Sequence, residues 1–543
     1  MAPVVRRLIA PAPSRHARAR AALACAGLLG LLGAALSLTQ PAAPPQSASP
    51  AKSASLVDSI ASQAQGALPS LSGVAHAAPP PADEGSAAAG SLRADLDALV
   101  DGARDLSGAQ IGVSVVDLAS GEVLYAREAD RALNPASNAK LVTTAAALSI
   151  LGPEHRYSTR VWTAGTIDAD GVLQGDLYLQ GGGDPSLVTG EVYELAGQLV
   201  AAGLTRVKGK IIVDATRFDG DGWPPGFEQK SEFASHRAPG GAMSVNYNTF
   251  EVHARPGAVG ASPTLRLLPE VDDLALESKA TTVAGKRNKL WVSTREEGGK
   301  TVVTFHGEIG TEAPAASYRY PVADPSRYAG ELLALSLRQR GVKLGNKARA
   351  QSGEVPKDAR LLATHRSETL SQLCRSVNKW SNNFMAEQIL RTLEPGDGAT
   401  AEQALERMRE YTKSIGVEQS GLVLGNGSGL YDNNAISPAA MTQLLAAVYA
   451  DFRIRSDYLA SLAVMGKDGT TRSRLHDSQA GGWVRVKTGT LDDVSALSGY
   501  AGAQGKDPIA FSILMNGLER KQRRQARALQ DALAERIAAE RAK

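Results

Sequence analysis

The sequence predicts a mixed α/β fold in which one α/β domain is interrupted by a large β-rich region. Residues 92–152 show the pattern of a helix, a β-hairpin and a second helix. Strand patterns followed by a helix return at the C-terminal end and supply partners for that hairpin. Strand patterns separated by Gly/Asp turns dominate the middle. We therefore expect a discontinuous domain at 93–160 and 360–543, with an inserted α+β region of two small subdomains at 161–359.

The expected elements of the first half follow from local periodicity. Helical spacing, turn residues and, for one helix, the start signal Asp324-Pro325-Ser326 define them. We expect helices at 92–100, 134–152, 191–204 and 323–342, hairpins at 110–130 and 289–309, and strands across 158–187 and 208–215.

The second half returns to helices before it ends in strands. Residues 371–393 and 402–416 have helical patterns. WVRVKTGTL, VSALSGYAGA and IAFSILMNG, all between residues 483 and 517, indicate three strands. The last 25 residues form an amphipathic pattern of mixed charge, which favours a surface helix over a nucleic-acid-binding arm.

Size, charge and metal-ligand patterns narrow the function. A chain of 543 residues is too long for one hydrophobic core. It carries 59 basic and 56 acidic side chains without a basic stripe interleaved with aromatics, so nucleic acid is not an expected partner. The eight histidines and two cysteines form no HExxH, HxH or CxxC pattern. We therefore expect neither a metal site nor a cofactor.

The N-terminus indicates export. Arginines between residues 6 and 20 precede an apolar run at 21–38, so residues 1–38 are expected to be a secretory signal or an uncleaved membrane anchor. Residues 39–92 are rich in Ala, Ser and Pro and indicate a linker. The expected location is the periplasm or cell envelope, and peripheral or anchored membrane association stays open.

Ser137 and Lys140 begin the helix predicted at 134–152 and lie three residues apart, so they share one face. A serine hydroxyl needs a base to act as a nucleophile, and a buried lysine can supply one in its neutral form. SxxK alone is weak, because it also occurs at 49–52 and 376–379. A capped helix with a solvent-directed lysine is the alternative for the isolated motif.

Two further motifs follow in the chain. Ser381-Asn382-Asn383 is an SxN triplet expected to open a helix, and Lys487-Thr488-Gly489-Thr490 lies on a predicted strand. SxN recurs elsewhere, whereas KTG occurs once. SxxK, SxN and KTG in this order, with KTG on a strand near the C-terminus, resemble the signature of penicillin-binding proteins and serine β-lactamases.

The spacing narrows the resemblance further. Ser137 and Lys487 are 350 residues apart, and the extra length lies between SxxK and SxN. In this the chain is similar, over roughly 93–520, to the D-alanyl-D-alanine carboxypeptidase/endopeptidase family of low-molecular-weight class C penicillin-binding proteins, peptidase family S13. Further similar stretches are GGGDPSL at 181–187, VNKWSNNFMAEQILR at 377–391, GNGSGL at 425–430 and GKDGTTRSR at 466–474.

The resemblance implies an acyl-transfer role for four residues. Ser137 would attack the carbonyl between two D-alanines of a peptidoglycan peptide, and Lys140 would take its proton. Ser381 would relay a proton to the leaving amine. Asn383 would hold Lys140 or the substrate amide.

It also implies how the KTG strand binds substrate. Lys487 and Thr488 would hold the terminal carboxylate. Gly489 would allow the strand to approach the substrate. Backbone N–H groups of Ser137 and Thr490 would form the oxyanion hole.

One subsite departs from the family pattern. Where the family commonly shows Asp-Gly-Ser-Gly-Leu-Ser-Arg, this chain ends the run at Asp432 instead of Arg. In some members that Arg, with an acidic and an aromatic residue of the insert, recognises the free end of a diaminopimelate side chain. Glu232 and Phe233 are the candidates here for the acidic and aromatic partners.

The expected function is a serine DD-peptidase that cleaves D-Ala-D-Ala, as a carboxypeptidase and in some settings as an endopeptidase on D-Ala-diaminopimelate cross-links. Peptidoglycan peptides and β-lactam antibiotics are the expected ligands. A catalytically slow peptidoglycan- or β-lactam-binding protein is the alternative. A β-lactamase is a third, although the sequence shows no second carboxylate-bearing loop after SxN that would serve deacylation.

Overall fold

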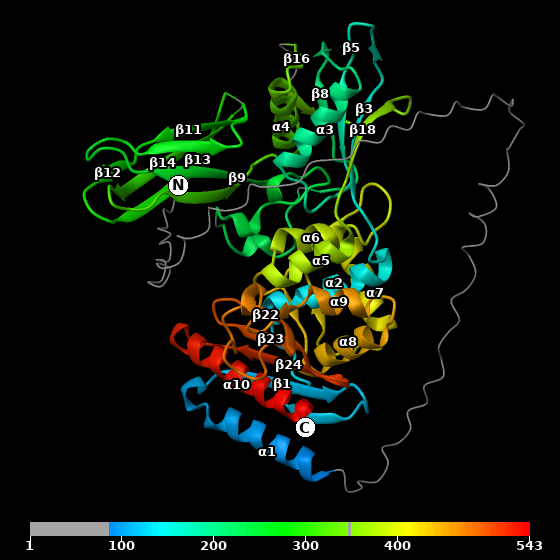
Figure 1. Cartoon of the computed structure of the whole chain (residues 1–543), viewed down its shortest axis with the longest axis vertical. Coiled ribbons are helices and arrows are strands. Elements are labelled where there is room, and N and C mark those ends of the chain that lie inside the picture. Colours follow the sequence, from blue (N-terminus) through cyan, green and yellow to red (C-terminus); the bar gives the residue numbers. More distant parts are fainter. Residues whose placement is uncertain (1–85, 221, 232, 299, 346–348) are drawn as a thin grey trace, which may run out of the picture. The chain divides into compact units, whose positions relative to one another are not determined.

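The mixed α/β class is confirmed by the structure, a computed structural model that describes residues 86–543 except 221, 232, 299 and 346–348 (Figure 1). The signal expected at 1–38 and most of the linker at 39–92 lie outside these residues. Within the described part of the chain, no helix combines the length and apolarity needed to cross a membrane.

The central antiparallel sheet joins the two ends of the chain, in the strand order β2-β1-β24-β23-β22-β21. β1 pairs with β24 along its whole length, so the first hairpin extends a sheet formed by C-terminal strands. The strands are β1 (Gln110–Asp117), β2 (Val123–Arg127), β21 (Ala463–Val464), β22 (Val484–Thr490), β23 (Ser495–Ala503) and β24 (Lys506–Asn516).

One face of this sheet is covered by the terminal helices α1 (Ser86–Gly102) and α10 (Arg523–Ala542). Alternate strand residues such as Val486 and Phe511 pack with Leu533 of α10 in one buried cluster. Successive side chains of a strand point to opposite sides of the sheet, so every second residue of these strands faces the terminal helices.

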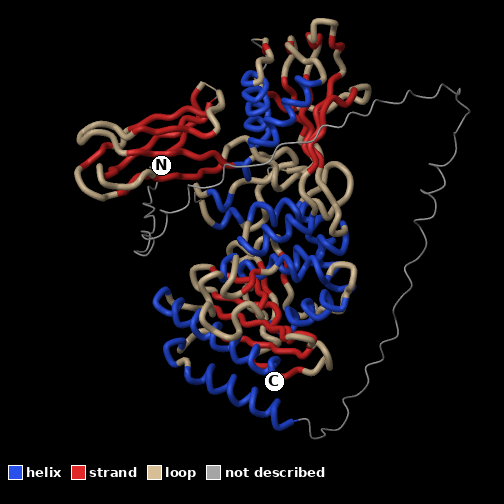
Figure 2. The backbone as a smooth tube through the Cα atoms, in the orientation of Figure 1, coloured by secondary structure: helices blue, strands red, loops and turns tan. Residues whose placement is uncertain are grey.

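The other face of the sheet is covered by a group of helices between residues 139 and 461, which Figure 2 shows above the strands. On this side Ser114 of β1 and Thr442 of α8 share a buried hydrogen bond of 2.8 Å. The helices are α2 (Ala139–Leu151), α5 (Leu370–Trp380), α6 (Asn383–Arg391), α7 (Ala401–Ser414), α8 (Pro438–Ala450) and α9 (Arg455–Ser461). The short strands β19 (Val423–Leu424) and β20 (Asn434–Ala435) pair nearby.

The first part of the insert contains two sheets, ordered β17-β8-β6-β3-β18 and β16-β7-β5-β4. Residues 360–366 were expected in the second segment of the discontinuous domain, 360–543. They form β18, which pairs with β3 and so extends the sheet of the insert. The elements are β3 (Ser158–Thr163), β4 (Thr166–Ile167), β5 (Val172–Gln174), β6 (Leu177–Gly181), α3 (Thr189–Ala201), β7 (Arg206–Val207), β8 (Ile211–Asp214), α4 (Pro325–Gln339), β16 (Lys343–Leu344), β17 (Ala350–Ser352) and β18 (Arg360–Arg366).

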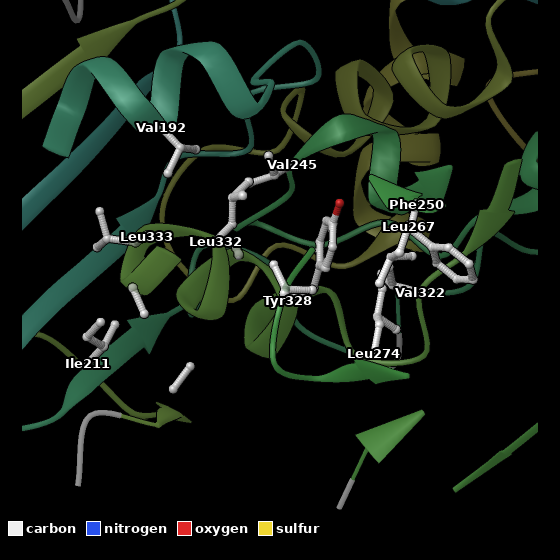
Figure 3. Packing of buried hydrophobic residues seen from close by; sticks show 14 of the residues in the cluster. Val192, Ile211, Val245, Phe250, Leu267, Leu274, Val322, Tyr328, Leu332 and Leu333 are labelled. Atoms are coloured by element: carbon white, nitrogen blue, oxygen red, sulfur yellow. The ribbon is translucent and has the colours of Figure 1, made fainter. Parts of the chain in front are cut away.

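The second part of the insert contains the sheets β10-β9-β15 and β11-β14-β12, with β13 also on β14. Figure 3 shows Tyr328 of α4 between Leu332 of the same helix and Phe250 of β9, within one buried cluster that continues to α3. The strands are β9 (Thr249–Arg255), β10 (Thr264–Leu268), β11 (Leu274–Ser278), β12 (Thr281–Val283), β13 (Asn288–Glu297), β14 (Lys300–Gly310) and β15 (Ala316–Pro321).

The insert reaches the catalytic helices beside α6. The backbone oxygen of His236 accepts a hydrogen bond from Asn383 Nδ2 at 3.2 Å. The Gln388 amide both donates to Gly241 O at 2.7 Å and accepts from Gly241 N at 3.1 Å. These contacts place insert backbone next to a residue of the SxN triplet.

Candidate active site

Ser137 lies in a short 3₁₀ turn, Ala136–Asn138, that leads directly into α2. Ala136 has φ +46°, a left-handed value that costs energy for a residue with a side chain. Gly429 lies against this turn, and a Cβ there would come within 1.8 Å of Ala136 O. The turn that carries Ser137 is therefore held in a tight conformation by a segment distant in sequence.

Lys140 is fully buried and its amine makes three hydrogen bonds. Nζ donates to Ser137 Oγ at 2.9 Å, to Asn383 Oδ1 at 2.7 Å and to Ser428 O at 2.5 Å. Burial lowers the pKa of Lys140 to about 7, although the charge of Glu387 opposes the change. The amine is therefore next to the hydroxyl and readily becomes neutral, as a general base requires.

The SxN triplet lies at a break between two helices. The helical pattern expected at 371–393 forms two helices, because α5 ends at Trp380 and α6 starts at Asn383, where the triplet was expected to open a helix. Ser381 takes a left-handed conformation with φ +58°, and the Asn382 side chain caps α6 by accepting from Met385 N at 3.0 Å. This break turns Ser381 and Asn383 toward the two lysines.

Lys487 does not direct its amine into open space. Its side chain is fully buried, and Nζ donates to Ser381 Oγ at 2.9 Å and to Thr488 O at 2.7 Å. Burial, and then the neighbouring Lys140, lower the pKa of Lys487 well below its usual value. The structure thus places Lys487 beside the SxN serine.

The rest of the KTG motif faces a pocket of about 310 Å³, which Ser137 and Ser381 also line. Thr488 and Thr490 border this pocket, and the Thr488 hydroxyl lies 2.8 Å from that of Thr470. Of the eight catalytic and substrate-binding residues predicted from sequence, five line this pocket, and Lys140, Asn383 and Lys487 are not among its lining residues.

Gly489 of the KTG strand lies against the turn that carries Ser137. A Cβ at this position would lie 2.6 Å from Pro135 O and 2.9 Å from the Ala496 Cβ. Gly489→Ala is therefore expected to push β22 from the loop, lowering the free energy of unfolding by about 1 to 3 kcal/mol and slowing penicillin acylation. Thermal unfolding and acylation rates measure both effects.

The matched control is Gly190→Ala in α3, where an added Cβ meets nothing within 4 Å. This control should leave acylation unchanged. Wild-type acylation in Gly489→Ala would contradict the close approach as a functional requirement.

Sequence reasoning missed two groups that hold the Lys140 amine in place. Ser428 contributes its backbone oxygen to Lys140 rather than its hydroxyl. The buried Glu387 accepts from Gly427 N at 3.1 Å and from Ser428 N at 2.7 Å, which fixes that oxygen. Burial raises the pKa of Glu387. Glu387 lies four residues after Asn383, so helical spacing could have indicated it.

Asp432 and Phe233, which were both expected at the diaminopimelate subsite, contact different parts of the chain. Asp432 is exposed, and its Oδ1 accepts a hydrogen bond from Asn134 Nδ2 at 2.9 Å. Asn134 lies two residues before the turn that carries Ser137. Phe227 packs edge-on against Tyr431 with ring centroids 5.8 Å apart. Phe233 instead stacks on Tyr320 of β15 at 5.5 Å. Glu232, the candidate acidic partner, lies outside the described residues.

Comparison with known proteins shows which protein family the chain belongs to. The D-Ala-D-Ala carboxypeptidase 3 (S13) family matches residues 92–537. This chain belongs to that family. A D-alanyl-D-alanine carboxypeptidase of Actinomadura sp. is 35% identical over 480 residues, covering 85% of this chain and 87% of the relative. The family predicted from the motifs is confirmed, and with it the assignment of a serine hydrolase.

Solved structures confirm the predicted penicillin-binding-protein fold. Penicillin-binding protein 4 of Haemophilus influenzae superposes with a TM-score of 0.71 at 20% identity, covering 82% of this chain and 99% of that one. The same protein complexed with a β-lactam gives a TM-score of 0.66 at 20% identity, covering 80% and 98%.

Proposed function

We propose that the chain is a serine DD-peptidase that cleaves the D-Ala-D-Ala bond of peptidoglycan peptides through an acyl-enzyme on Ser137. The observation that carries this proposal is the 2.9 Å hydrogen bond between the Lys140 amine and Ser137 Oγ, beside a pocket that both motif serines line. Family membership supplies the substrate class, and the arrangement supplies a nucleophile with its base.

Acylation begins when Ser137 Oγ attacks the carbonyl carbon and its proton passes to Lys140 Nζ. Backbone N–H groups of Ser137 and Thr490 stabilise the oxyanion, a contribution of about 3 to 4 kcal/mol for one donor in comparable hydrolases. Asn383 and Ser428 O keep the Lys140 amine directed at the hydroxyl.

Departure of the leaving group requires a proton on its nitrogen. Ser381 Oγ donates this proton, and the Lys487 amine, 2.9 Å away, replaces it. Lys140 passes on the proton that it took from Ser137 to restore Lys487, so Lys140 is neutral again before deacylation. Water then attacks the acyl carbonyl, Lys140 accepts the water's proton, and Ser137 leaves and is reprotonated. A β-lactam mimics the substrate and stays attached to Ser137 after ring opening; binding of a β-lactam is in keeping with the β-lactam complex of the structural neighbour.

Substrate scope and location complete the proposal. Endopeptidase cleavage of D-Ala-diaminopimelate cross-links uses the same steps, because the leaving group is again an amine next to a carboxylate. Peptidoglycan lies outside the cytoplasmic membrane, so the protein is exported to the periplasm or cell envelope, consistent with the charged and apolar pattern at 1–38.

The deciding experiment measures fluorescent-penicillin labelling together with D-alanine release from a peptidoglycan pentapeptide. A DD-peptidase labels and releases D-alanine at a steady rate. Labelling without release would support the alternative of a catalytically slow binding protein. Rapid loss of the label with intact peptide would instead indicate a β-lactamase.

The Asp432 position leads to a prediction on side-chain selectivity. An exposed carboxylate disfavours the free carboxylate of a diaminopimelate side chain, so the wild-type protein should show little preference for free over amidated diaminopimelate. Asp432→Arg should raise the free-to-amidated ratio of kcat/KM about two- to fivefold, because solvent screens exposed charge pairs. Matched muropeptides measure this ratio.

Asp432→Asn is the control, since an asparagine oxygen can still accept from Asn134 while the charge is removed. It should raise the ratio less than arginine does. A strong wild-type preference for the free form that arginine leaves unchanged would show that another residue recognises that carboxylate.

A further inference from the structure

Strand alternation divides the KTG motif between two faces of the sheet. Val484 and Val486 pack in the cluster that includes α10, so Thr488 and Thr490, at the same period of two, lie on the α10 face. Lys487 lies on the opposite face and its amine reaches Ser381. The lysine of the motif is therefore turned away from the hydroxyls that follow it.

The pocket wall on the α10 face carries other cations. Arg474 and Arg527 line it together with Thr488 and Thr490. No aspartate or glutamate is among the described residues that line this pocket. The lining is thus rich in hydroxyl and guanidinium groups and suits an anion.

The two arginines differ in their exposure and in whether a carboxylate neutralises their charge. Arg474 is only 8% exposed, and its Nε donates to Asp531 Oδ1 at 2.7 Å, so its charge is neutralised locally. Arg527 is exposed, and within the described residues no carboxylate forms an ion pair with it. Its guanidinium is close enough to Arg474 to lower the pKa of that residue, after the larger effect of burial. The uncompensated charge of this wall therefore resides on Arg527.

We propose that Arg527 binds the carboxylate next to the scissile bond, together with the hydroxyls of Thr488 and Thr490, while Lys487 serves the proton path through Ser381. A guanidinium offers two parallel N–H donors that match a carboxylate. The pocket's hydroxyls supply the remaining donors. This assignment replaces the carboxylate-binding role that the motif alone implied for Lys487, and it rests on the proposed DD-peptidase function.

The test compares substrates that differ only in this carboxylate. One pair is a peptide ending in D-Ala-D-Ala and its C-terminal amide, measured by kcat/KM. The other is benzylpenicillin and its methyl ester, measured by the rate of acylation in mass spectrometry. Arg527→Gln should lower both carboxylate reactions about 10- to 100-fold and change the amide and ester reactions less than about twofold, because one charge-assisted contact is lost. Arg527→Lys should recover part of the loss.

Arg524→Gln is the matched control, an exposed arginine one turn earlier on α10 that does not line the pocket. It should change neither member of a pair. Equal losses of the charged and uncharged substrates in Arg527→Gln would indicate a structural role and overturn the proposal, as would unchanged rates with the carboxylates. A wild-type protein that forms no penicillin adduct and releases no D-alanine would overturn the DD-peptidase function itself, a separate result.

Discussion

Ser137→Ala is expected to abolish covalent penicillin labelling and to lower peptide hydrolysis on the order of 10⁶-fold, the scale seen when a serine hydrolase loses its nucleophile. The substitution removes the only atom that the proposed mechanism acylates. Its effect on folding should be small, because Ser137 Oγ accepts a hydrogen bond from Lys140 and does not cap the helix. Intact-mass spectrometry after penicillin treatment measures the adduct, and thermal unfolding tests the fold.

Ser376→Ala is a matched control because Ser376 and Lys379 form a second SxxK spacing on α5. There the lysine amine is engaged elsewhere, with Asp468 Oδ2 at 2.6 Å and Leu462 O at 2.8 Å. This variant should label like the wild type. A covalent adduct on folded Ser137→Ala would place the nucleophile at another residue.

The contrast between these two SxxK sequences shows what the motif alone could predict. Spacing places serine and lysine on one helical face in both cases. Only at 137–140 do Asn383 and Ser428 O, from distant segments, direct the amine toward the serine. Local sequence therefore indicated candidates, and tertiary packing distinguishes between them.

The fold could be predicted where periodicity was strong. The hairpin at 110–130 and the three C-terminal segments are runs of strand length rich in apolar residues, with alternation in VRVKTGT, and the structure pairs them in one sheet. The SxN triplet was expected to open a helix, and α6 starts at Asn383. No Gly or Pro marks the end of the preceding helix; Ser381 holds the left-handed conformation there instead. The Asn382 cap of α6 was the available signal.

Long-range contributions to the site left no local signal. Arg527 is one of several arginines on an amphipathic helix, and its place beside Thr488 depends on how α10 packs across the sheet. The direction of Lys487 could have been derived from strand alternation, since it opposes that of Thr488. The motif alone led to the assignment of Lys487 and Thr488 to one carboxylate, although their side chains lie on opposite faces of the strand.

Lys140→Met is expected to slow acylation about 100- to 10,000-fold for every substrate, charged or uncharged, because it removes the general base and keeps a side chain of similar length in the buried site. Stopped-flow acylation with benzylpenicillin and its methyl ester measures both. Equal losses with the two substrates are the expected signature, in contrast to the carboxylate-selective loss expected for Arg527→Gln. Wild-type rates would exclude Lys140 as the base.

The pH dependence provides an independent check on the same residue. Only neutral Lys140 can accept the Ser137 proton, and burial lowers its pKa to about 7. The wild-type acylation rate should therefore be highest above pH 7 and fall toward tenfold per unit well below it.

A variant of Glu387 tests whether Lys140 sets the pH at which the acylation rate falls, since the charge of Glu387 raises the pKa of Lys140. Glu387→Gln removes that charge, so the rate should persist to lower pH. Lys140→Met should lose the inflection near pH 7 altogether. If the inflection stays in Lys140→Met at a reduced rate, another group with a pKa in this range must take the proton, and Lys140 would act by positioning Ser137.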